Sequence, residues 1–125
     1  MGRRARRREK LTAPRSDYSD PQGNVLTLRG SLTPAARREY AETLAGGGEQ
    51  AARGRAAETQ EDAWQRAVEL LFERLAVRWV VAGAPIDRQR ELLLRLRAAS
   101  PAERGWVRET LRVHCAEHFP DVSAP

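Results

Sequence analysis

An amphipathic pattern between residues 59 and 79 limits the possible folds more than any other feature of this chain. Apolar residues recur there at spacings of four, three, one, three and four, at positions Trp64, Val68, Leu71, Phe72, Leu75 and Trp79. This spacing places them on one face of a helix. Glu61 and Asp62 suit its first turn, where the helix dipole favours negative charge. Because such a stripe must be buried, the sequence predicts a helix packed into a core.

Capping residues predict three further helices. Thr33 followed by Pro34 begins a helix that ends at the glycines of 46–48, since a threonine hydroxyl caps free N–H groups and proline fits the first helical position. Asp87 is the expected cap of a third helix, which buries three leucines. Ser100 opens a capping box with proline in the first turn, and this fourth helix is predicted to end at Phe119.

The strand signals are fewer. Residues 24–30, with the sequence NVLTLRG, alternate in polarity and predict one short strand that ends at the glycine. Residues 79–82 are either the end of the second helix or a short strand paired with 24–29, and Gly83-Ala84-Pro85 breaks the segment in both cases. The predicted fold class is mainly α: a small four-helix domain that leaves room for a minor two-stranded β element, with a disordered N-terminal arm.

The basic charge is concentrated at the N-terminus. Residues 1–15 have a net charge of +6, and the other residues have a net charge of −1. We therefore divide the chain into a disordered arm (1–23), a helical domain (24–120, with a flexible loop at 46–58) and a C-terminal tail (121–125). The arm could contact nucleic acid weakly and without sequence selectivity, because guanidinium groups displace counterions from phosphates and no aromatic residue is interleaved for stacking. The candidate residues are Arg3, Arg4, Arg6, Arg7, Arg8 and Lys10.

Composition excludes several classes of protein. The longest clear apolar run, at 79–82, is far too short to cross a bilayer. No apolar segment follows the charged N-terminus, so we expect no secretory signal. The single cysteine, Cys115, excludes an internal disulfide and favours a reducing cytoplasm.

The pentapeptide HCAEH at 114–118 has the His-x-x-Glu-His pattern of inverzincin metallopeptidases, in which two histidines hold zinc and the glutamate is the base. A catalytic zinc needs a third protein ligand, and only Asp121, just past a proline, follows as an acid. The histidines also continue the helical stripe of Val107 and Leu111. We therefore expect them to pack against the core, with incidental metal binding and peptidase activity as alternatives. We predict no catalytic residue, metal or cofactor.

The aromatic residues suggest where a partner binds. Trp64 and Trp79 belong to the stripe of the second helix, whereas Trp106 lies one face away from Val107. Aromatic side chains that remain partly exposed commonly anchor protein interfaces. The predicted partner-binding residues are Trp106, Tyr40 and Trp79.

The order of these elements resembles the small tail assembly chaperones of long-tailed phages. The resemblance covers residues 24–120, and two motifs carry it: a Leu-Thr…Glu-Tyr helix start and a Trp-x-x-x-Gly-x-Pro-Ile break. The matching residues are Leu32, Thr33, Glu39, Tyr40, Trp79, Gly83, Pro85 and Ile86. The Arg-rich arm is not part of the pattern.

The resemblance implies a non-enzymatic helical protein that binds the tape-measure protein along its length during tail assembly. The alternative function is a nucleic-acid-associated protein anchored by its basic arm. The sequence leaves the partner's identity and the formation of a homo-oligomer open.

Overall fold

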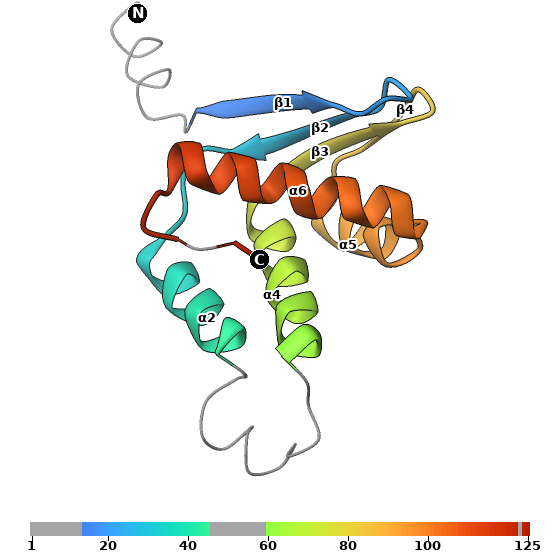
Figure 1. Cartoon of the computed structure of the whole chain (residues 1–125). Coiled ribbons are helices and arrows are strands. Elements are labelled where there is room, and N and C mark those ends of the chain that lie inside the picture. The colour runs from blue at the N-terminus through green and yellow to red at the C-terminus, as the bar shows by residue number, and fades with distance from the viewer. Residues whose placement is uncertain (1–13, 46–59, 123) are drawn as a thin grey trace, which may run out of the picture.

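The computed structural model describes residues 14–45, 60–122 and 124–125. In this part of the chain, pairs of strands alternate with pairs of helices (Figure 1). The elements are β1 (Arg15–Ser19), β2 (Val25–Arg29), α2 (Pro34–Leu44), α4 (Gln60–Leu75), β3 (Ala76–Val81), β4 (Ala84–Ile86), α5 (Gln89–Arg97) and α6 (Pro101–His118). The flexible loop expected at 46–58 lies outside the described residues.

The four strands form one antiparallel sheet in the order β1-β2-β3-β4. Tight hairpins join β1 to β2 and β3 to β4, and α2 and α4 lie between β2 and β3 in the sequence. The register places Tyr18, Leu26, Trp79 and Ile86 side by side across the four strands. Because cross-strand partners project from the same side of a sheet, these residues form one row on one face.

The helices cover only that face of the sheet. Figure 1 shows the strands along the top of the molecule and all the labelled helices on one side of them. Leu26 and Trp79 on the covered face are 0% exposed, as are Phe72 of α4 and Val107 of α6. Residues on the opposite face, such as Val80, remain half-buried or exposed. One core therefore lies between the sheet and the helices, and the second face of the sheet is open.

The fold-class prediction was wrong, because the described residues contain a four-stranded sheet in addition to their helices. Residues 15–19, expected within the disordered arm, form β1 and pair with β2 along their whole length. Residues 76–81 form β3, so α4 ends at Leu75 and Trp79 belongs to a strand. The alternative in which this segment pairs with 24–29 is confirmed.

The break at Gly83 is the turn of the β3–β4 hairpin. Ala82 and Gly83 both have positive φ, at 51° and 79°, which is the backbone twist of the two-residue turns that best join antiparallel strands. The side-chain oxygen of Asn24 accepts a hydrogen bond from the Ala82 N–H at 2.9 Å. This bond stabilises a left-handed conformation that alanine rarely adopts.

The helix ends follow local capping chemistry. Thr33 caps α2 and Ser100 forms the complete capping box of α6, as predicted. The prediction for α5 was wrong by one residue, since Arg88 is its N-cap and makes no side-chain cap bond. In the described part of the chain, no helix is long and apolar enough to cross a membrane.

A matched pair of leucines on α5 tests this packing. Leu92 is 2% exposed and Leu94 is 54% exposed. We expect Leu92→Ala to lower the free energy of unfolding by about 2–5 kcal/mol, because it leaves a cavity in the core. Leu94→Ala should change it by less than about 0.5 kcal/mol. Urea unfolding followed by circular dichroism measures both, and equal losses would contradict the orientation of α5.

Candidate functional site

The HCAEH segment lies in the last turns of α6 and belongs to the buried stripe of that helix. Val107, Leu111, His114 and Cys115 are each at most 1% exposed, and His118 is half-buried. Residues at these spacings lie along one face of a helix. The prediction that the histidines continue the packing stripe is therefore confirmed.

His114 forms two hydrogen bonds that join α6 to both N-terminal strands. Its Nε2 lies 2.6 Å from the carbonyl oxygen of Arg29, and its Nδ1 lies 2.8 Å from the hydroxyl of Tyr18. Because a carbonyl oxygen only accepts, the geometry assigns the proton to Nε2, and Nδ1 accepts from the Tyr18 hydroxyl. Both ring nitrogens are satisfied in the neutral imidazole. Burial, which disfavours the charged form, lowers the pKa of His114.

The second histidine also bonds to a strand. His118 Nε2 lies 3.2 Å from the hydroxyl oxygen of Ser16, and its ring centroid is 4.4 Å from that of His114. Glu117 of the same motif is exposed. Among the residues that the structure describes, no three His, Cys, Asp or Glu side chains gather as a metal site would require.

Cys115 is a packing residue. Its side chain is 1% exposed, and burial raises the pKa of its thiol to about 11. The thiol is therefore protonated at neutral pH, whereas the thiolate is the nucleophile and metal ligand. The prediction of a small buried apolar residue is confirmed.

Two of the three predicted partner-binding residues lie in the core. Tyr40 is 3% exposed and Trp79 is 0% exposed. The pairing of β3 directs Trp79 toward the helices, where the guanidinium carbon of Arg95 lies 5.2 Å from its ring centroid. Trp106 is half-buried and reaches the surface. The predicted nucleic-acid residues, Arg3 to Lys10, lie outside the described residues.

A pocket of about 410 Å³ opens beside Trp106. It lies between the β1–β2 turn and the start of α6, and its lining residues are Asp20, Pro21, Gln22, Asn24, Ser100, Ala102, Glu103 and Trp106. The Asp20 carboxylate accepts hydrogen bonds from two backbone N–H groups of its own turn, each at 2.9 Å. The Glu103 carboxylate is paired with Arg95 at 2.6 Å. Because both carboxylates are engaged, the pocket presents mainly the Trp106 ring, Pro21 and Ala102.

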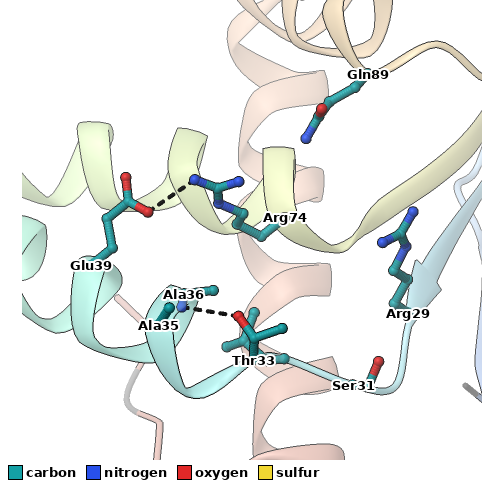
Figure 2. Close-up of a pocket in the computed structure, with 9 residues that line it drawn as sticks. Arg29, Ser31, Thr33, Ala35, Ala36, Glu39, Arg74 and Gln89 are labelled. Carbon is teal, nitrogen blue, oxygen red and sulfur yellow. Dashed lines mark hydrogen bonds and ion pairs between the residues drawn. The ribbon is translucent and has the colours of Figure 1, made fainter.

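A more polar pocket of about 310 Å³ lies between β2, α2 and α4 (Figure 2). Glu39 of α2 pairs across it with Arg74 of α4 at 2.9 Å. The Thr33 hydroxyl accepts from the Ala36 N–H at 3.1 Å as the cap of α2. Arg29, at the end of β2, forms no ion pair with any described residue. Sequence analysis missed both pockets, because their walls come from segments far apart in the chain; only the position of Trp106 off the packing stripe pointed to one of them.

No protein-family model matches this chain, and no curated protein or solved structure is significantly similar to it. The resemblance to tail assembly chaperones therefore stays a prediction made from the sequence. A proposal for the function must therefore rest on the geometry of the structure. The relevant features are the two pockets, the histidine pair and the uncovered face of the sheet.

The buried imidazole predicts a loss of stability in mild acid. The pKa of His114 is below its ordinary value of 6.5, so the unfolded chain binds the proton more readily than the folded chain. His114 therefore contributes full stability above about pH 6.5, and this contribution is lost as the pH falls toward the lowered pKa.

The measurement is urea unfolding at about pH 7.5 and about pH 5.5. We expect the wild type and His118→Gln to lose stability at the lower pH, because both retain His114. His114→Gln should be less stable at pH 7.5 and should show a weaker pH dependence in this range. An unchanged pH dependence in His114→Gln would contradict the neutral buried imidazole.

Proposed function

We propose that this chain is a non-enzymatic, cytoplasmic binding protein that takes a helical segment of another protein against the N-terminal half of α6. The observation that carries the proposal is the half-buried Trp106 beside a pocket whose carboxylates are already bonded within the chain. From the sequence resemblance to tail assembly chaperones, we propose that the partner is a phage tape-measure protein and that binding takes place during assembly of a phage tail.

The chemistry of the Trp106 pocket supports binding of an apolar side chain. Partly exposed tryptophans are common anchors of interfaces, since the ring supplies a large contact area with few rotatable bonds. Burying a polar group costs free energy when it loses hydrogen bonds to water. Because Asp20 and Glu103 keep internal hydrogen bonds, covering this pocket would cost little.

Gly105 supports the close approach of a partner helix. It lies next to Trp106 inside an 18-residue helix, where glycine is about 1 kcal/mol less favourable than alanine. A Cβ added at this position would meet nothing within 4 Å, so packing within the chain does not require glycine. A third pocket, of about 350 Å³, flanks it and is lined by Gln65, Val68, Leu96, Pro101, Arg104, Gly105 and Arg108.

The groups able to do chemistry are engaged in packing, which supports binding over catalysis. Both ring nitrogens of His114 have partners, and the pKa of Cys115 is raised to about 11. A catalytic site needs a base or nucleophile with access to a substrate. The alternative function, nucleic-acid binding, would use a different surface from the Trp106 pocket.

Removal of the Trp106 ring tests whether the proposed partner binds at this pocket. We expect Trp106→Ala to abolish or greatly reduce co-purification with a tape-measure protein encoded in the same genomic neighbourhood, because an anchor residue contributes about 2 kcal/mol or more to binding. Val113→Ala is the matched control, since Val113 is 48% exposed on the same helix. Absence of such a gene, or equal capture by both variants, would contradict the proposal.

Gly105→Ala should have opposite effects on stability and binding. Alanine favours the helix, so the free energy of unfolding should rise by about 0.4–1 kcal/mol. The added methyl group should weaken binding of the same tape-measure protein at least severalfold, because it holds the partner helix away. Urea unfolding and co-purification measure the two effects. A variant that is more stable and binds as tightly as the wild type would rule out close approach at this position.

A further inference from the structure

The outward-facing strand positions carry three arginines, one of which, Arg29 at the end of β2, also lines the pocket between β2, α2 and α4. The register places Asp17, Thr27 and Arg78 in one row, and Arg15 beside Arg29 in the next. The Thr27 hydroxyl bonds to the Asp17 carboxylate at 2.6 Å, which confirms that these side chains share a side of the sheet. All three arginines are exposed. We call these five residues the open sheet face.

No carboxylate neutralises these three arginines within the described part of the chain. Arg15 and Arg29 lie directly opposite each other in the β1–β2 pair, and like charges in that position destabilise a sheet. Local conflicts of this kind are tolerated at functional sites. An anion held between the two guanidinium groups would relieve the repulsion.

Several arginines on the helical side of the molecule, in contrast, are paired with acidic residues. Six arginines on the helical side form ion pairs: Arg37–Asp121, Arg74–Glu39, Arg95–Glu103, Arg97–Glu69, Arg108–Glu61 and Arg112–Glu109. The described residues contain fourteen arginines and fourteen acidic side chains, so this part of the chain is neutral as a whole. The open sheet face, with three arginines and one aspartate, is thus a local excess of positive charge.

We propose that the open sheet face binds the phosphate backbone of double-stranded DNA through Arg15, Arg29 and Arg78. Guanidinium groups pair with phosphate oxygens through two parallel hydrogen bonds and release condensed counterions. Figure 2 shows Arg29 at the end of β2 without a bond to any other labelled residue. The strand that carries Arg15 begins five residues after Lys10, the last residue of the basic arm, so the two basic regions are close in the sequence.

The open sheet face carries no aromatic side chain on its described strands. The neighbouring row on the same side of the sheet consists of Ser19, Val25, Val80 and Pro85, which are not aromatic either. Proteins that hold single strands stack the bases on aromatic rings, so this face should prefer a duplex. Contacts made only to phosphates carry no sequence information, and binding should therefore be insensitive to base sequence and sensitive to salt.

The test is a fluorescence-anisotropy titration of a labelled 20-base-pair DNA duplex with the full chain at several NaCl concentrations. We expect the double variant R29Q/R78Q to raise Kd at least tenfold at low salt. The slope of log K against log [NaCl] should become shallower by about 1.8, or about 0.9 for each lost phosphate contact. The matched control, R38Q/R90Q, removes two exposed arginines of α2 and α5 that form no ion pair with a described residue, and should change Kd less than threefold.

Four results would overturn the proposal. The first is no binding of the duplex by the wild type. The second is an equal loss in the two double variants, or none in R29Q/R78Q, which would assign the effect to overall charge or to the arm. The third is tighter binding of a single strand of the same length. The fourth is tighter binding of poly-glutamate that depends on Arg29 and Arg78, which would identify an acidic protein as the occupant. Circular dichroism confirms that each variant is folded.

Discussion

The imidazole of His114 holds the N-terminal hairpin on the last helix. One ring nitrogen bonds to Tyr18 of β1 and the other to the backbone of Arg29 at the end of β2. β1 pairs with β2 along its whole length but has few apolar side chains to bury, so the bond between Tyr18 and His114 adds a link from this edge strand to the core. A buried polar group that lost such partners would cost about 1–3 kcal/mol. A neutral His114 can accept from Tyr18 and donate to the Arg29 carbonyl at the same time, so it ties both N-terminal strands to α6.

The one-sided arrangement of helices gives the molecule two separate surfaces. On the helical side, ion pairs neutralise six arginines, and the half-buried Trp106 lies beside a pocket with little unsatisfied polarity. At the outward-facing strand positions, three arginines have no carboxylate partner among the described residues, and one of them, Arg29, also lines the pocket between β2, α2 and α4. An apolar partner and a polyanion would thus be bound on different faces, and the proposed protein-binding and DNA-binding functions are open to independent tests.

Local chemistry could be predicted from the sequence, and pairing between distant segments could not. Thr33 and Ser100 were identified as caps because a cap depends on residues within one turn. β1 was missed because its covered positions are Ser16 and Tyr18, which bond to histidines and give no alternation of apolar residues. Trp79 was assigned to a helix because it lies four residues after Leu75, yet pairing with β2 outweighs that spacing.

In the candidate site, too, the features of a single helix could be predicted, and contacts between distant segments could not. The burial of His114 and Cys115 followed from their register with Leu111, a property of one helix. The two hydrogen bonds of His114, the pocket beside Trp106 and the clustering of Arg15, Arg29 and Arg78 each require two or more elements to meet in space. No spacing within one element signals these contacts.

The protonation state of the His114 ring is the most direct test of this account. A long-range ¹H–¹⁵N NMR spectrum of the histidine side chains at neutral pH resolves which nitrogen carries the proton. We expect a neutral ring with the proton on Nε2, an unprotonated Nδ1 and cross-relaxation between the rings of His114 and Tyr18, whose centroids are 5.6 Å apart. A protonated imidazolium, a proton on Nδ1, or a ring that averages between the two tautomers would contradict it.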